Sequence, residues 1–307
     1  MQKEQYIGLL SLKFEDLIQK AFKAKMDNRG PKLSLCTIMN VKSGACTEDC
    51  AFCAQSARYK TGAPVYPLVS EDKILKQAEA AKESGASRFS LVASGKGPSP
   101  KEVDYFAEIV SKIKTKIGIN VCASLGIMDL SGLKVLKQAG LTRYHHNLET
   151  CKTFFPSIVS THDYEARVNT IKQAQEAGLE VCAGGIIGLG ETPEHRLELA
   201  LELKSLKVNS VPLNFLIPIE GTPLYNASVS ISPLEAIKTI AIFRITMPDV
   251  ALRLAAGRES LLKDFLALAF YAGADSMMIG GYLTKRGRPI EEDQAFCKEI
   301  KKMWADC

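Results

Sequence analysis

Three cysteines, Cys46, Cys50 and Cys53, lie within one short segment of the chain, with three and then two residues between them. Thiolates at this C-x3-C-x2-C spacing can bind three irons of a cubane cluster and leave the fourth iron without a protein ligand. A zinc site is the alternative, but zinc needs a fourth Cys or His nearby, and none lies between Cys53 and Cys122. The spacing therefore predicts a [4Fe–4S] cluster with an open iron that can bind a small molecule.

A second set of residues with metal chemistry falls in predicted strands: Cys36, Cys122, Cys182 and Arg253. If their strands are the first, third, fifth and seventh of a barrel, the four side chains form one inward layer, because alternate strands supply each layer. A buried arginine needs a negative partner, and an anionic cluster with thiolate ligands would be one. Any one of these cysteines could equally be a small buried apolar residue. The prediction of a second metal centre depends on the whole set.

Polar residues follow two later predicted strands. His145, Asn147 and Glu149 alternate along the end of the fourth strand and should share one face. Only one of the adjacent pair His145 and His146 should therefore line a site. Asn214 ends the sixth predicted strand. Such positions in a barrel are typical of binding or catalytic residues.

The elements that position these residues follow a repeated pattern of amphipathic helix, small residue with glycine, and short apolar strand. Strands are predicted at 34–40, 88–93, 118–123, 142–147, 180–186, 210–217, 250–254 and 275–280. Helices are predicted at 4–26, 71–84, 101–116, 130–139, 163–177, 193–206, 232–246, 260–272 and 290–304. Eight βα units in about 250 residues indicate a TIM-type (β/α)8 barrel. A doubly wound open sheet is the alternative, but nothing divides the strands into two halves.

The composition limits the class of protein. The chain has 307 residues, a formal net charge of +5, and acidic and basic residues mixed along its length. We therefore expect no nucleic-acid partner and no membrane surface, and no apolar run of roughly 18 residues predicts a membrane helix. Nine cysteines in a chain of this size favour metal binding or catalysis over disulfides. We predict one domain over 1–307, with its core at about 33–282, in the cytoplasm.

The cysteine segment, with the aromatic Phe52 before its last cysteine, resembles the radical S-adenosylmethionine superfamily and, within it, the biotin synthase family. The resemblance extends over nearly the whole chain, through the segments 43–62, 146–150, 181–192, 221–224 and 253–259. It implies that S-adenosylmethionine binds at the open iron and is cleaved to a 5′-deoxyadenosyl radical. That radical would take hydrogen from dethiobiotin, and sulfur from the second cluster would close the ring of biotin. It also implies flavodoxin or ferredoxin as electron donor, and a homodimer.

The resemblance implies roles for single residues. The cysteines of the first cluster and Arg253 would be catalytic. The residues that would bind S-adenosylmethionine are Phe52, Asn147, Glu149, Arg167 and Ile187. The residues that would bind dethiobiotin are His145, Asn214 and Thr284. Glu149 stands where the family commonly has Asp, and His145 where Asn is more usual.

One departure from the better-known form of the family concerns the second cluster. That form has a cysteine at the Ser90 position and a residue other than cysteine at the Cys36 position. The number of thiolates is preserved here while one ligand has moved. We expect Cys36, Cys122 and Cys182 to bind a sulfur-donating cluster of the four-iron type with Arg253 as a neighbour, and a [2Fe–2S] cluster remains the alternative.

Overall fold

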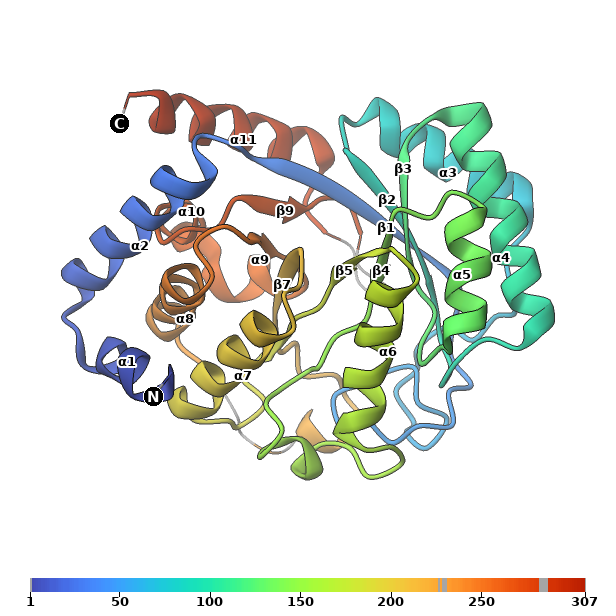
Figure 1. Cartoon of the computed structure of the whole chain (residues 1–307), viewed down its shortest axis with the longest axis horizontal. Coiled ribbons are helices and arrows are strands. Elements are labelled where there is room, and N and C mark those ends of the chain that lie inside the picture. Colours follow the sequence, from blue (N-terminus) through green and yellow to red (C-terminus); the bar gives the residue numbers. More distant parts are fainter. Residues whose placement is uncertain (1, 226, 228–230, 282–286, 307) are drawn as a thin grey trace.

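The computed structural model describes residues 2–225, 227, 231–281 and 287–306. Within these residues one parallel sheet closes into a barrel, in the strand order β5-β4-β3-β2-β1-β9-β8-β7-β6 with β5 also paired to β7. Helices surround the barrel (Figure 1). The closed parallel sheet confirms the predicted TIM-type (β/α)8 fold. No helix in the described part of the chain is long and apolar enough to cross a membrane.

The bounds of the elements are as follows. The strands are β1 Ser34–Lys42, β2 Arg88–Ala93, β3 Asn120–Ser124, β4 Arg143–His145, β5 Glu180–Cys182, β6 Gly185–Ile187, β7 Ser210–Phe215, β8 Ala251–Leu254 and β9 Ser276–Met278. The helices are α1 Gln2–Ile7, α2 Phe14–Arg29, α3 Glu71–Glu83, α4 Pro100–Lys112, α5 Leu130–Gln138, α6 Tyr164–Glu176, α7 Pro193–Ser205, α8 Pro233–Thr246, α9 Arg258–Leu262, α10 Leu266–Tyr271 and α11 Ile290–Ala305.

The predicted fifth strand is split into β5 and β6. At the break, a Cβ on Gly184 would lie 2.0 Å from the carbonyl oxygen of Pro212 in β7, so only glycine permits this close approach. Pro212 also has no N–H to donate to the sheet. The ladder resumes when Gly185 pairs with Leu213.

Two predicted helices are also interrupted. The helix expected at 4–26 ends at Ile7, and after a 3₁₀ turn the backbone is extended at Leu12 before α2 begins. Glycine at position 8 has low helix propensity, which favours this break. The helix expected at 260–272 is divided by a 3₁₀ turn into α9 and α10, and Lys263 lies between them with φ +44°.

Several helices around the barrel begin at well-defined caps. Ser99 before α4 and Ser232 before α8 form capping boxes with glutamates three residues later. In each case proline follows the cap, where its missing N–H costs nothing. These caps fix where the helices start and so where the preceding βα loops end, which is the side of the barrel that carries the predicted site.

The chain ends cover the outside of the barrel. α2 packs against α8 and α10, and α11 lies close to α2, with Lys25 Nζ 3.0 Å from the centroid of the Trp304 ring. Figure 1 shows α2, α8, α10 and α11 on the same side of the barrel. The predicted N-terminal helix and C-terminal helical extension are therefore present, although the first is in two parts.

Candidate active site

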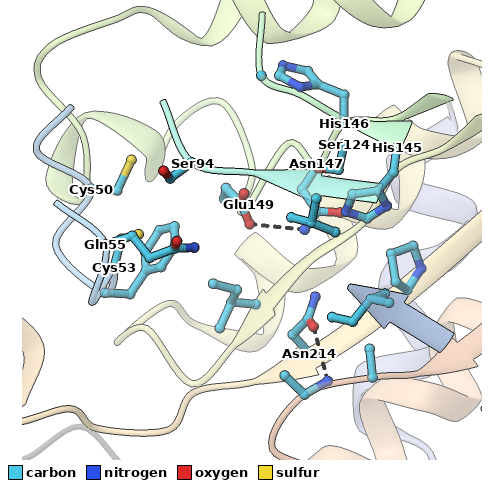
Figure 2. A pocket seen from close by; sticks show the side chains of 18 of the residues that line it. Cys50, Cys53, Gln55, Ser94, Ser124, His145, His146, Asn147, Glu149 and Asn214 are labelled. Atoms are coloured by element: carbon cyan, nitrogen blue, oxygen red, sulfur yellow. Dashed lines mark hydrogen bonds between the residues drawn. The ribbon is translucent and has the colours of Figure 1, made fainter. Parts of the chain in front are cut away.

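A cavity of about 400 Å³ opens at the C-terminal ends of the strands and reaches into the barrel. In Figure 2, Cys50 and Cys53 lie on one side of it, His145 on the other, and Glu149 between them. The predicted site residues that line it are Cys36, Cys46, Cys50, Phe52, Cys53, Cys122, His145, Asn147, Glu149, Arg167, Cys182, Asn214 and Arg253. Segments distant in the sequence thus meet in one cavity.

The three-cysteine loop leaves β1 through two residues in the left-handed region, Gly44 (φ 74°) and Ala45 (φ 53°). The loop then closes on itself. Cys46 N–H donates to Gln55 O over 3.1 Å, and Ala57 N–H donates to Cys46 O over 2.7 Å. This backbone framework holds the cysteines at the mouth of the cavity, as expected for residues that follow the first barrel strand.

The loop thiols have a chemical environment that suits metal ligation. Burial raises the pKa of Cys50 to about 12, although Arg167 opposes it, and burial also raises the pKa of Cys53. A thiolate in such a place needs a cationic partner, and iron supplies one. Among the described residues, no group of His, Cys, Asp or Glu is arranged to hold a single metal ion. Three cysteine thiols at this spacing are the donor set of an iron–sulfur cluster.

Beside this loop, three predicted S-adenosylmethionine contacts are joined by hydrogen bonds. Asn147 Nδ2 donates to Glu149 Oε2 over 3.3 Å (Figure 2). Arg167 Nη1 donates to Asn147 O over 2.9 Å and pairs with Glu149 Oε1 at 3.4 Å. The structure brings these residues together from the end of β4 and from α6, with Glu149 in the left-handed region at φ 69°.

Deeper in the barrel, Cys36, Cys122, Cys182 and Arg253 come from β1, β3, β5 and β8. Because the fifth barrel strand is split, β8 is the seventh strand of the barrel, so the four lie on alternate strands. All four are buried and line the same cavity. Arg253 Nη1 donates to Cys182 Sγ over 3.4 Å, and its Nε donates to Ser276 Oγ over 3.1 Å. The structure therefore assembles the layer that the sequence suggested.

The protonation of these thiols differs from one to the next. Burial raises the pKa of Cys36 and of Cys122. Burial also acts on Cys182, but the neighbouring His145 ring and Arg253 outweigh it and lower the pKa of Cys182 to about 6. His145 and Cys182 are direct neighbours across β4 and β5. His145 thus contacts the cysteine layer, a contact that its position in the sequence did not suggest.

Two further arginines lie next to this layer. Arg88 Nη2 and Arg143 Nη2 share one carboxylate oxygen, Glu180 Oε2, at 2.9 and 2.7 Å. Arg143 and then Arg88 oppose the effect of burial on the pKa of Cys122. Since two guanidinium groups share one carboxylate, the surroundings of the cysteines carry an excess of positive charge that suits an anionic cluster.

Ser90, which stands at the position of the family's usual cysteine, also lines the cavity. It pairs in register with Ile38 of β1 on one side and with Cys122 of β3 on the other. Cys36 lies two residues before Ile38 on the same face of β1. The thiol of Cys36 is therefore on the strand next to Ser90, two residues before the residue that pairs with this serine.

Other predicted residues are placed differently from expectation. Ile187 is fully buried and is not among the described residues that line the cavity, whereas its neighbour Ile186 is. Successive side chains of a strand point to opposite faces, so Ile186 faces the cavity instead. His146 lines the cavity as well as His145, because β4 ends at His145 and strict alternation stops there. Thr284 lies outside the described residues.

Asn214 lines the cavity with its side-chain amide already engaged. Its Nδ2 donates to Gly185 O over 3.2 Å, and its Oδ1 accepts from Ala256 N–H over 3.2 Å. Figure 2 marks the second of these bonds. The amide thus ties β6 to the loop after β8. A ligand bound here would meet an asparagine held in a fixed orientation.

Among the residues of the cavity wall to which sequence reasoning assigned no role are Glu48 and His162. Glu48 lies between Cys46 and Cys50, and His162 precedes α6. Both line the cavity, and His162 Nδ1 lies 2.5 Å from Glu48 Oε2. The only signal for Glu48 was its position within the cysteine motif, and no local pattern marked His162.

A parallel barrel with a three-cysteine loop after its first strand defines a radical S-adenosylmethionine enzyme. In agreement, residues 40–203 match the model of the Radical SAM superfamily, and residues 212–301 match the Biotin and Thiamin Synthesis associated domain. The chain is 46% identical to biotin synthase of Pelotomaculum thermopropionicum over 96% of its length and 91% of that protein. It is 49% identical to biotin synthase of Thermotoga neapolitana over 90% of its length and 98% of that protein. The chain belongs to the biotin synthase family.

Solved structures show the same fold at low sequence identity. Methylornithine synthase (PylB) matches with a TM-score of 0.83 and 22% identity over 97% of this chain and 92% of that one. The FeFe-hydrogenase maturase HydG from Carboxydothermus hydrogenoformans matches with a TM-score of 0.79 and 20% identity over 93% of this chain and 70% of that one. These likenesses support the barrel and not a particular substrate.

Proposed function

We propose a division of work among the residues of this cavity for the reaction of the family, the radical insertion of sulfur into dethiobiotin to form biotin. One observation carries the proposal. The three-cysteine loop at the cavity mouth and the layer of Cys36, Cys122, Cys182 and Arg253 at its base border one space of about 400 Å³. A substrate held between them would have a radical source on one side and a sulfur source on the other.

The cofactor chemistry has two parts. When bound, the [4Fe–4S] cluster with S-adenosylmethionine supplies a radical that can attack an unactivated C–H bond, for which no side chain is basic enough. Cys46, Cys50 and Cys53 would hold this cluster. Their loop would leave one iron facing the cavity, as its three-ligand spacing implies.

The adenosyl group would lie against the Asn147–Glu149–Arg167 cluster. Glu149 Oε1 and Oε2 are acceptors that suit ribose hydroxyl groups. Arg167 Nη1 lies 3.4 Å from Glu149 Oε1 and would hold this carboxylate in place. Phe52 would contact the nucleoside from the cysteine loop. Ile186, which lines the cavity, would take the apolar role first expected of Ile187.

Dethiobiotin would lie deeper, between the adenosyl site and the cysteine layer. Asn214 and His145 border this space, and both carry groups that can hydrogen-bond a ureido ring. Thr284 would meet the substrate carboxylate. Because the side chain of Asn214 is fixed by two backbone partners, it would orient the ring with little loss of entropy on binding.

For the auxiliary centre we propose Cys36, Cys122 and Cys182 as ligands. Three thiols on alternate strands of one layer suit a four-iron cluster with an open iron that could carry the sulfur to be inserted. Arg253 would then neutralise charge as a neighbour. A [2Fe–2S] cluster with a relocated ligand is the alternative, and it would need Arg253 as a ligand.

The proposal is tested by anaerobic reconstitution with iron and sulfide analysis and Mössbauer spectra. Cys36→Ala should lose the iron of the auxiliary centre and biotin formation while still cleaving S-adenosylmethionine. Cys50→Ala should stop that cleavage. Ser90→Ala, the matched control on the neighbouring strand, should keep its iron and its activity.

Three results would count against these assignments. Full iron content and biotin yield in Cys36→Ala would exclude the relocated ligand. Loss of the auxiliary centre in Ser90→Ala would show that serine is the ligand. Continued formation of 5′-deoxyadenosine by Cys50→Ala would contradict the assignment of the first cluster.

The remaining proposals rest on the family resemblance alone. A flavodoxin or ferredoxin of the cytoplasm would supply electrons, and the chain would form a homodimer. Light scattering of the purified protein measures its mass directly, and the mass of a single chain would exclude the homodimer. The electron donor is tested by using purified flavodoxin in place of a chemical reductant in the turnover assay.

A further inference from the structure

The loop that carries the cysteines is held by a second segment, residues 158–162, which leads into α6. Ala51 N–H donates to Ile158 O over 2.9 Å. Ser160 N–H donates to Asp49 Oδ1 over 3.0 Å, and Thr161 Oγ1 donates to Glu48 Oε2 over 2.7 Å. The segment 158–162 therefore contacts residues that lie directly between the proposed cluster ligands.

The last residue of this segment, His162, makes two contacts of opposite kind. Its Nδ1 lies 2.5 Å from Glu48 Oε2, and its Nε2 accepts from Arg167 Nε over 3.0 Å. Since Nε2 accepts, the ring proton must be on Nδ1, which donates to Glu48. Burial, and then the charge of Arg167, lower the pKa of His162, which agrees with a neutral ring.

The connection continues past Arg167 to the proposed adenosyl site. While Nε of Arg167 binds His162, its Nη1 donates to Asn147 O and pairs with Glu149 Oε1. The side chains of Glu48, His162, Arg167 and Glu149 are 9%, 5%, 11% and 13% exposed. An unbroken chain of hydrogen bonds thus runs from the cysteine loop to Glu149, the carboxylate proposed above to meet the ribose.

We propose that His162 is a positioning residue that couples the cysteine loop to the adenosyl site, so that the nucleoside binds more tightly when the loop holds its cluster. The proposal rests on the roles proposed above for Arg167 and Glu149. A cluster fixes the loop, the fixed Glu48 orients the His162 ring, and the ring aligns Arg167. Orienting Glu149 before the ligand arrives lowers the entropic cost of binding, and the coupling is reciprocal.

The test uses 5′-deoxyadenosine as the probe, because it lacks the amino and carboxylate groups that could bind iron. Its affinity is measured by calorimetry for the reconstituted and the iron-free full-length protein. In the wild type the reconstituted form should bind roughly tenfold more tightly, within the usual range of such coupling. His162→Ala should reduce this ratio to about one. Any effect of the auxiliary centre on affinity is common to the wild type and His162→Ala, so it cancels when their ratios are compared.

Two conservative variants separate coupling from folding. His162→Asn keeps a donor near the position of Nδ1, and His162→Gln keeps an acceptor near the position of Nε2. Each variant retains one of the two contacts of His162, with Glu48 or with Arg167, so both should fold. Both should lose the tenfold difference in affinity between the reconstituted and the iron-free protein. His195→Ala is the matched control, since His195 caps α7 outside the cavity, and it should keep the ratio.

The outcomes distinguish this proposal from the one on which it rests. An unchanged ratio in folded His162→Asn and His162→Gln overturns the coupling. If His162 were merely structural, its substitution would weaken binding of 5′-deoxyadenosine equally in the reconstituted and the iron-free protein. The ratio of the two affinities would then stay as in the wild type, and this result also overturns the coupling. If Glu149→Gln leaves the affinity of the reconstituted protein unchanged, the adenosyl site itself is wrongly placed, and both proposals are withdrawn.

Discussion

His145 is the residue whose surroundings differ most from its expected role. It was expected at the substrate ring, yet it pairs in register with Cys182 on the neighbouring strand, and its ring lowers the pKa of that thiol. A polar group that stabilises the thiolate of a ligand also stabilises the reduced, more negative form of a cluster. His145 is therefore in a position to set the potential of the auxiliary centre as well as to meet the substrate.

His145→Ala should lower the reduction potential of the auxiliary centre by on the order of 60 mV, which is the one-electron equivalent of a tenfold loss in the stabilisation of the reduced form. A spectroscopic redox titration measures the shift. His145→Gln keeps a donor and should restore part of the potential. An unchanged potential together with a raised KM for dethiobiotin would assign His145 to the substrate alone.

Among the elements, β6 is the one on which the site depends most closely. Its first residue, Gly185, forms a bridge with Glu149, and Ile186 N–H donates to Glu149 O over 2.8 Å. A Cβ on Gly185 would lie 2.4 Å from that same oxygen. The start of β6 thus determines where the backbone of Glu149 can lie.

Gly185→Ala should displace Glu149, lower the free energy of unfolding by about 1–3 kcal/mol through overpacking, and weaken S-adenosylmethionine binding. Urea unfolding and a binding isotherm measure the two effects. Gly8→Ala is the control, because a Cβ there would meet no atom within 4 Å. Binding of wild-type strength by Gly185→Ala would show that the close approach does not position the site.

The start of α4 predicts a pH dependence. Partial burial raises the pKa of Glu102, but Lys42 of β1, at 2.8 Å, and the Ser99 cap outweigh it and hold the pKa below the ordinary value of 4.5. A carboxyl group with a lowered pKa in the folded state contributes stability that is present above its unfolded value. That contribution is lost as the pH falls through the folded value.

Glu102→Gln, which can still form the capping box, should therefore lower the free energy of unfolding by up to about 1 kcal/mol at neutral pH. The difference from wild type should vanish as the pH falls below 4.5. Urea unfolding as a function of pH measures it. In a Lys42→Met background the difference should shrink at every pH, and a difference that grows in acid would contradict the prediction.

At the scale of the whole molecule, the barrel closes where its first and last strands meet. Asp275, just before β9, has no exposed side-chain surface and accepts from Leu252 N–H over 2.8 Å. It also pairs with Arg29 at 2.6 Å and with the buried Arg244 at 3.4 Å. One carboxylate therefore joins α2, α8 and β8 at the closing seam.

Asp275→Ala should destabilise the whole barrel by about 3–5 kcal/mol, because the change leaves the charge of Arg244 buried without its partner. Thermal unfolding should remain a single transition at a lower temperature. Glu299→Ala, which removes an exposed pair with Lys302, should cost less than about 1 kcal/mol. A comparable effect of the two substitutions would show that the seam is not held by this carboxylate.

The amino-acid order alone specifies the repeated helix and strand pattern, the three-cysteine spacing and the set of cysteines on alternate strands. These features depend on local periodicity or on residue type, so they are visible without coordinates. They were sufficient for the barrel fold and the family, and most of the predicted site residues line the cavity.

Contacts between distant segments decided the rest. The fifth strand is split where Gly184 meets Pro212 of β7, a close approach that involves two distant segments. Glu48 and His162 are more than a hundred residues apart and meet only in the folded chain. Short-range patterns carry no information about such pairs, because which loops meet at a barrel mouth depends on how all the strands close.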